Sequence, residues 1–337
     1  MPEEFPRIKR LPQYVFAVVN DLKARLRKEG EDIIDLGMGN PDLPPAPHII
    51  EKLCEAAKKK TTHRYSMSQG IPRLRKAIAD FYKKRYDVDL DPEKEVIMTI
   101  GSKEGLAHLM LAMLEPGDIA MVPSPRYPIH YYAPVIAGAS VLTVPLPLEG
   151  SDSEKQEQFL KNIYETYEDS YPEAKVLILN FPNNPTTMTV DLEFFKEIVA
   201  FAKKRNLWII HDLAYGDLCY DGYKAPSILQ VEGAKDVAVE TYSMTKGFSM
   251  AGWRVAFVLG NETLVYNLKR LKSYLDYGTF TPIQVASIIA LEGDYSIVEK
   301  ARDTYSKRLD ILVDGLNKAG WPVEKPKATM FLWAKIP

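Results

Sequence analysis

Short apolar runs alternate with amphipathic stretches through the middle of the chain. The runs of strand length are EVIMTI (95–100), DIAMV (118–122), SVLTV (140–144), KVLILN (175–180), LWIIHD (207–212), VAVETYS (237–243) and WRVAFVLG (253–260). Several are apolar on both faces, which is typical of strands in a parallel sheet that is covered on both sides. Helical patterns lie between them, for example at 103–114 and 192–205. This alternation predicts an open α/β sheet.

The two ends of the chain have a different pattern. Residues 13–28 have the periodicity of an amphipathic helix, and a loop rich in glycine and proline follows at 37–47. From about residue 283 the pattern is again helical, and 329–336 favours a short strand. We therefore predict a large domain of about 48–275 and a small domain built from 1–47 and 276–337.

Composition and charge narrow the functional class. Among 337 residues, 43 basic and 45 acidic side chains leave a net charge of −2, so neither a basic field for nucleic acid nor a polybasic membrane anchor is expected. The chain shows no signal-peptide pattern and no apolar run that could span a bilayer. Cys54 and Cys219 lack metal-ligand spacing. We expect a cytoplasmic protein without a metal site, a nucleic-acid partner or a membrane partner.

Polar residues follow several predicted strands, at the edge where open α/β sheets bind ligands. Gly101 begins a turn into a helix, whose free N–H groups suit a phosphate, although an ordinary turn explains it as well. Tyr127 follows the second strand, and Asn184 lies in a proline-flanked turn after the fourth. Asp212 ends the fifth strand, where an ionised carboxylate needs a partner.

Two basic residues follow the sixth strand. These are Lys246 and, eight positions later, Arg254. Each of these residues alone has an ordinary interpretation as a solvated lysine or a structural ion pair. Together, however, a lysine, a carboxylate, an amide, tyrosines and a phosphate-binding turn are what pyridoxal 5′-phosphate (PLP) requires. It needs an amine for its aldehyde, an anion for its pyridine nitrogen and donors for its phenolate oxygen.

Three spaced motifs resemble the signature of class I/II aminotransferases, the PLP fold type I (aspartate-aminotransferase-like) family. The motifs are Asn180-x-Pro-x-Asn184-Pro-Thr, Asp212-x-x-Tyr215 and Ser243-x-x-Lys246-x7-Arg254. The resemblance runs from about Tyr14 to the final residue, and it is strongest to bacterial alanine and LL-diaminopimelate aminotransferases. It implies a mostly parallel central sheet in a large domain, together with a smaller α+β domain.

The resemblance also implies roles around the cofactor ring. Lys246 would carry PLP as a Schiff base and then move a proton at the substrate Cα. Asp212 would pair with the pyridine nitrogen, and Tyr215 and Asn184 would donate to the phenolate oxygen. Tyr127 would lie over the ring face.

Further residues would hold the phosphate. Ser243, Arg254 and the turn at Ser102 and Lys103 would bind it, since an arginine fork can bind two oxygens at once. Tyr65 corresponds to a family tyrosine that reaches the phosphate of the partner subunit, so the resemblance implies a homodimer with shared active sites.

Substrate contacts follow less directly from the resemblance. Gly39 and Asn184 would contact the substrate, and Tyr14 would line its pocket. Lys103 aligns with a lysine that recognises a distal carboxylate in some relatives, which suggests glutamate/2-oxoglutarate as one substrate pair. A solvated lysine at a helix start explains it equally well. The second pair would be alanine, aspartate or a similar amino acid with its 2-oxo acid.

Two departures from the family pattern stand out. Thr187 occupies a position where the family usually has glycine, and we expect it to reshape the turn after Asn184. The sequence ends at Pro337, whereas family members continue and include an arginine that clamps the substrate carboxylate. We therefore expect the printed sequence to be an incomplete record of the enzyme.

Two alternatives use the same residues. A C–S β-lyase needs the same lysine, aspartate, tyrosine and asparagine, because PLP supplies the electron sink in both reactions. A non-catalytic PLP-binding sensor domain would carry an N-terminal DNA-binding module. The first 45 residues or so resemble an aminotransferase N-terminus instead.

Overall fold

The computed structural model describes residues 5–37 and 39–337. The chain forms two compact units, one ending at Pro41 and the other spanning Asp42–Pro337. The N-terminal unit holds α1 (Pro6–Lys9) and α2 (Val15–Lys28), so the helix predicted at 13–28 is confirmed. The division into a large and a small domain that was predicted from the sequence stays a prediction.

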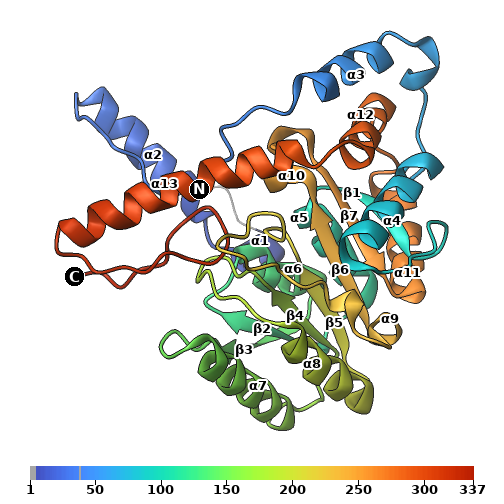
Figure 1. The fold of residues 1–337 in the computed structure, drawn as a ribbon. Helices are drawn as coiled ribbons and strands as arrows, with labels where there is room; N and C mark the ends of the chain where they lie inside the picture. Colours follow the sequence, from blue (N-terminus) through green and yellow to red (C-terminus); the bar gives the residue numbers. More distant parts are fainter. Residues whose placement is uncertain (1–4, 38) are drawn as a thin grey trace. The chain divides into compact units, whose positions relative to one another are not determined.

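The seven strands predicted in the middle of the chain are all present in the unit 42–337. They are β1 (Val96–Ile100), β2 (Ile119–Ser124), β3 (Ser140–Pro145), β4 (Val176–Asn180), β5 (Trp208–Asp212), β6 (Ala238–Ser243) and β7 (Val255–Gly260). They form one sheet in the order β1-β7-β6-β5-β4-β2-β3 (Figure 1). β7 runs antiparallel to β1 and β6, and the other pairs are parallel. The predicted mostly parallel sheet is therefore confirmed.

Helices cover both faces of this sheet, as the doubly apolar strands require. In β4, Leu177 and Leu179 contribute to the core on one face, while Val176 and Ile178 contribute to the core on the other. The first face is covered by α3 (Pro47–Ala57), α4 (Pro72–Tyr86), α7 (Asp152–Glu168), α8 (Leu192–Arg205) and α12 (Thr281–Glu292). The second is covered by α5 (Ser102–Met113), α6 (Pro128–Ala137) and α11 (Glu262–Leu275). The remaining helices are α9 (Ala234–Val237), α10 (Met244–Gly247) and α13 (Ser296–Lys318), with short 3-10 turns at Lys60–His63, Ile228–Gln230 and Ala251–Trp253.

Two helix starts set the position of functional side chains. Gly101 precedes α5 with φ of +77°, a left-handed backbone conformation that glycine adopts without steric cost. Tyr127 precedes α6, and Pro128 occupies its first position, where a missing N–H costs no hydrogen bond. Both starts follow directly from strands, so the first turns of α5 and α6 lie at the carboxyl edge of the sheet.

The strand predicted at 329–336 is wrong. The start of the segment and the residues just before it form hydrogen bonds to a loop instead: Thr329 N donates to Leu218 O (2.9 Å), and Tyr220 N donates to Lys327 O (2.8 Å). The bridge between Cys219 and Ala328 stays isolated. The apolar pattern therefore reflects packing of this segment on residues 215–220 rather than sheet pairing.

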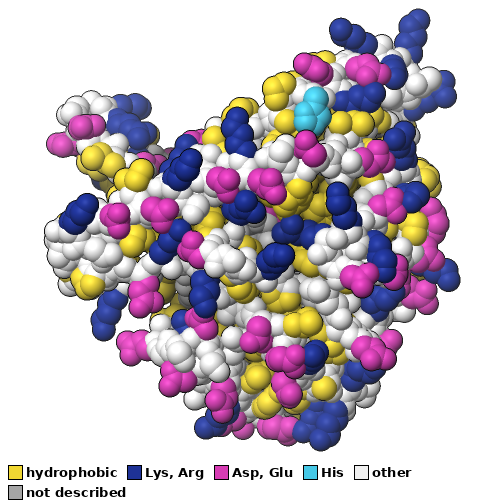
Figure 2. Space-filling view, viewed as in Figure 1, with side chains coloured by type: hydrophobic (Ala, Val, Ile, Leu, Met, Phe, Trp, Pro, Cys, Tyr) yellow, Lys and Arg dark blue, Asp and Glu magenta, His cyan; other side chains and the backbone are white. Residues whose placement is uncertain are grey.

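The surface agrees with the balanced composition. Figure 2 shows Lys and Arg side chains interspersed with Asp and Glu over the displayed face. None of the helices in the described residues is long and apolar enough to cross a membrane.

Candidate active site

The sheet register brings the predicted residues to one edge. Asn180 lies opposite Asp212 in the β4–β5 pair, and Asp212 lies opposite Thr241 in the β5–β6 pair. Because β7 is antiparallel to β6, it begins at the same edge, with Ala256 opposite Ser243. The residues that follow β6 and those that precede β7 therefore meet there.

Asp212 is a buried carboxylate with two side-chain partners. It is 3% exposed, and Thr241 Oγ1 donates to its Oδ1 over 2.9 Å. His130 Nε2, in the first turn of α6, lies 2.9 Å from its Oδ2. Since an ionised carboxylate can only accept, His130 donates this hydrogen bond. These partners offset the cost of burying the charge at the last residue of β5.

Asn184 and Tyr215 are held close to this aspartate. Asn180 Nδ2 donates to Asp212 O (2.7 Å), and the Asn180 amide oxygen accepts from Asn184 N (2.8 Å). Burial, and then the charge of Asp212, raises the pKa of the Tyr215 hydroxyl above its usual value. A hydrogen bond with the side chain of Asn184 acts in the opposite direction. Tyr215 is therefore a neutral hydroxyl donor at physiological pH.

Lys246 lies in the short helix α10 at the end of β6. Ser243 caps this helix, with its Oγ accepting from Thr245 N over 3.2 Å. The Lys246 ammonium lies 5.5 Å from the centre of the Tyr215 ring. Burial, together with the charge of Arg254, lowers the pKa of Lys246 to about 8. An amine with that pKa is suited to nucleophilic and proton-transfer chemistry near neutral pH.

Ser102 and Arg254 form an arrangement that fits a phosphate. The Arg254 guanidinium packs so closely on Gly101 that a Cβ there would overlap it. Among buried side-chain atoms of the described residues, Ser102 Oγ is one of four without a hydrogen-bond partner. An anion bound here could accept hydrogen bonds from the Ser102 hydroxyl, from the N–H groups at the start of α5 and from the Arg254 guanidinium. The residues present therefore fit the phosphate of PLP.

Tyr127 and Lys103 lie near this arrangement. The Tyr127 ring contacts the His130 ring edge-on at 5.6 Å between centres. The Lys103 ammonium lies 5.6 Å from the centre of the Tyr127 ring. Tyr127 therefore contacts both Lys103 at the start of α5 and His130, the residue that donates to Asp212.

The roles of three further residues, Tyr65, Tyr14 and Gly39, stay predictions. Tyr65 is 94% exposed, and its ring contacts that of Tyr277. Tyr14, which precedes α2, and Gly39 belong to the unit that ends at Pro41. Their roles at the substrate stay predictions.

The sequence analysis missed His130 and Thr241. His130 is three positions after Tyr127 on a helix face that is otherwise apolar, and a histidine in that setting is usually a satisfied core residue. Its partner Asp212 is 82 positions away, so no local spacing marks the pair. The one available signal was its position in the first turn after a strand.

Together these groups fit the chemistry of a fold type I PLP enzyme. Residues 31–337 match the family model for aminotransferase class I and II. The chain belongs to this family, and it is a PLP-dependent transaminase that moves amino groups between amino acids and 2-oxo acids. The predictions of fold, cofactor and activity are confirmed.

Named relatives support this assignment over nearly the whole chain. The sequence is 57% identical to glutamate-pyruvate aminotransferase AlaC of Escherichia coli, over 99% of this chain and 79% of the relative. It is 42% identical to LL-diaminopimelate aminotransferase of Moorella thermoacetica, over 99% and 84%. The structure resembles that of aspartate aminotransferase from Thermotoga maritima with a TM-score of 0.88, at 30% identity, over 99% and 85%.

Proposed function

We propose that this transaminase uses glutamate/2-oxoglutarate as one substrate pair and alanine/pyruvate as the other. The observation that carries the proposal is the 57% identity to a glutamate-pyruvate aminotransferase. The position of Lys103 in the first turn of α5 is consistent with recognition of a second carboxylate. Aspartate and LL-diaminopimelate are the competing amino donors.

Three side chains of the site would contact the ring of the cofactor, and a fourth would orient one of them. When bound, PLP supplies an electron sink for charge that develops at the substrate Cα. Asp212 would face the pyridine nitrogen, with His130 keeping the carboxylate oriented. Tyr215 and Asn184 would donate hydrogen bonds to the phenolate oxygen, a role that a neutral hydroxyl and an amide can both perform.

Lys246 would hold the cofactor covalently and, once released, move the proton at the substrate Cα. With a pKa of about 8, roughly a tenth of the free amine is neutral at pH 7 and able to accept that proton. An ordinary lysine would be almost entirely charged at this pH. Burial at the end of β6 therefore prepares this residue for its role.

The phosphate would be bound at the start of α5. Arg254 offers a planar fork of donors, and Ser102 offers a hydroxyl that lacks a partner in the described residues. Ser243 and the backbone at Lys103 would complete the set. Gly39, Asn184 and Tyr14 would contact the substrate.

A homodimer with shared sites is supported by an exposed aromatic surface. Tyr65 contacts Tyr277 at 5.9 Å between ring centres, and His63 contacts Phe280 at 5.7 Å. All four rings are exposed in the single chain. Exposed aromatic groups of this kind are typical of protein interfaces. Tyr65 would cross this interface to the phosphate of the partner.

Subunit mixing tests the shared site. A hybrid of one Lys246→Ala and one Tyr65→Phe subunit contains one complete site if Tyr65 acts across the interface. We expect both homodimers to be impaired. The hybrid should regain the activity of one intact site, and that site should bind PLP with normal affinity. A hybrid that shows no recovery, or a monomer by light scattering, would rule out the arrangement.

We also propose a cytoplasmic location. The two cysteines are free in the structure, which is in keeping with a reducing compartment. Cell fractionation with an antibody to the native chain tests this.

The substrate proposal is tested by half-reactions of the full-length enzyme. Conversion of bound PLP to its pyridoxamine form is followed by absorbance with alanine, glutamate, aspartate and LL-diaminopimelate. We expect alanine and glutamate to have the highest kcat/KM. Faster conversion by LL-diaminopimelate would assign the other substrate class. Release of pyruvate and ammonia from a cysteine conjugate at a faster rate would favour the C–S β-lyase alternative.

A further inference from the structure

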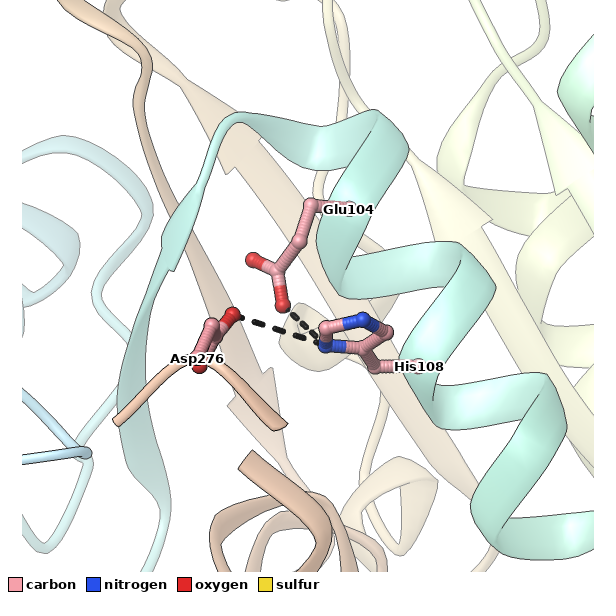
Figure 3. A group of neighbouring side chains, drawn as sticks. All are labelled: Glu104, His108 and Asp276. Carbon is pink, nitrogen blue, oxygen red and sulfur yellow. Dashed lines mark ion pairs between the residues drawn. The ribbon is translucent and has the colours of Figure 1, made fainter. Parts of the chain in front are cut away.

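A cluster of charged side chains lies between the first turns of α5 and the end of α11. Glu104 and His108 project from α5, and Asp276, just after α11, faces them (Figure 3). Lys272, in the last turn of α11, donates to Glu104 Oε1 over 2.9 Å and to both carboxylate oxygens of Asp276 over 3.0 and 2.8 Å. Lys272 is 2% exposed, so solvent screens its charge only weakly.

Glu104 connects the cluster to the turn that would bind the phosphate. Its Oε2 accepts from Ile100 N over 2.7 Å, while its Oε1 accepts from Lys272. Ile100 ends β1 and Glu104 lies in the first turn of α5, so the carboxylate spans both sides of Gly101 and Ser102. The hydrogen bond between Ile100 N and Glu104 therefore stabilises the turn that carries Ser102.

The charge of Glu104 opposes phosphate binding unless it is compensated. A carboxylate in a first helical turn is favoured by the helix dipole, but it repels a second anion at the same N-terminus. Burial would raise the pKa of Glu104, yet the hydrogen bond with His108 and the charge of Lys272 lower it to about 2. Glu104 is therefore ionised at neutral pH, and Lys272 is a buried counter-charge that it shares with Asp276.

The same three ligand-type groups could be mistaken for a metal site. One ligand atom each of Glu104, His108 and Asp276 lies within 4.8 Å of the others. The Lys272 ammonium, however, already bridges the two carboxylates. The positive charge between the two carboxylates is therefore the ammonium group of Lys272.

We propose that Lys272 is a positioning residue for the cofactor phosphate. It neutralises Glu104, so that the carboxylate can hold the β1–α5 turn without repelling the phosphate bound at that turn. The inference rests on the proposed assignment of Ser102 and Arg254 to the phosphate.

The test compares two forms of the cofactor on the cofactor-free, full-length protein. Dissociation constants are measured by absorbance titration for PLP and for pyridoxal, which lacks the phosphate. Their ratio reports the phosphate contribution alone. We expect Lys272→Met to reduce the preference for PLP about 10-fold or more, with a smaller change for pyridoxal. Lys272→Arg, which keeps the charge, should retain most of the preference.

Removing the opposing charge should reverse the effect. Lys272→Met combined with Glu104→Gln should regain most of the PLP preference, because the glutamine can still accept from Ile100 N. Glu104→Gln alone should equal or exceed the wild type in this preference. The matched control is Arg270→Met, which removes an exposed charge from the same helix and should leave the ratio unchanged.

The outcomes separate this inference from the assignment on which it rests. If Lys272→Met weakens PLP and pyridoxal equally, or fails to fold while the double variant shows no preference for PLP, the positioning role is overturned. If Arg254→Met lowers the ratio and Lys272→Met does not, only the inference fails. If Arg254→Met leaves the ratio unchanged, the phosphate assignment fails and this inference with it.

Discussion

His130 Nε2 donates a hydrogen bond to Asp212 Oδ2 across 2.9 Å, in a setting where both side chains are almost fully buried. The contact joins the first turn of α6 to the end of β5. It fixes the orientation of the carboxylate that would face the pyridine nitrogen. The other oxygen of Asp212 is held by Thr241, so the carboxylate has little freedom to turn.

Replacement of His130 should therefore slow the reaction without removing a group that touches the substrate. We expect His130→Ala to lower kcat about 10- to 100-fold, the range typical when a partner of a functional group is lost. The KM for the amino acid should change little. His130→Gln, which can still donate, should recover part of the rate. Equal losses in both variants, with matching losses in stability, would point to a purely structural residue.

Asp212→Asn tests the carboxylate itself. The amide cannot balance a protonated pyridine nitrogen, so the electron sink is weakened while the phosphate contacts stay intact. We expect PLP to remain bound and kcat to fall by about two orders of magnitude or more. Steady-state kinetics and the absorbance spectrum of the bound cofactor are the measurements. A rate near that of the wild type would leave Asp212 as a structural carboxylate at the strand end.

The sequence predicted the sheet well because buried strands leave a local signal. Each of the seven strands is an apolar run that needs no knowledge of its neighbours, and the carboxyl edge then follows from topology. The 329–336 segment shows the limit of this reasoning. It has the composition of a strand, but its backbone partners lie in the loop that contains Leu218 and Tyr220.

The charged partners of the site were not predictable in the same way. Lys272 is 168 positions from Glu104, and His130 is 82 positions from Asp212. Neither pair has a spacing that a single sequence can reveal. The first pair depends on how α11 packs against α5, and the second on how α6 packs against the end of β5. The residues at strand ends were found, whereas the residues that orient them were not.

Thr187 carries backbone strain that glycine would relieve. Its φ is +61°, in the left-handed region, and its N–H still donates to Asn183 O over 3.0 Å. That conformation costs a residue with a side chain about 1–2 kcal/mol, and glycine loses about 0.5–1 kcal/mol in chain entropy. We expect Thr187→Gly to raise the free energy of unfolding by about 0.5–1 kcal/mol on balance. Chemical denaturation measures the change, with Thr187→Ala as the control that should not stabilise. A less stable glycine variant would show that the threonine side chain makes compensating contacts.

The lowered pKa of Lys246 predicts a specific dependence of stability on pH. In the cofactor-free protein this pKa falls from 10.5 to about 8, because burial disfavours the ammonium form. Between these two values the unfolded chain binds more protons than the folded one, so this group makes stability rise with pH over that range. Well below pH 8 the folded state bears the full cost of the buried charge, about 3 kcal/mol.

A non-titrating side chain at this position should remove that cost. We expect Lys246→Met to be more stable than the wild type, both without cofactor, by the largest margin below pH 8. The margin should shrink as the pH rises and approach a constant packing difference near pH 10.5. Denaturant unfolding at several pH values measures it, and Lys307→Met serves as the control for loss of an exposed charge. Since the tyrosines titrate in both proteins, their effect cancels in the difference. A margin that stays the same from pH 7 to pH 10 would mean that the amine is hydrated in the folded state. The neutral fraction needed for proton transfer at neutral pH would then have to come from another cause.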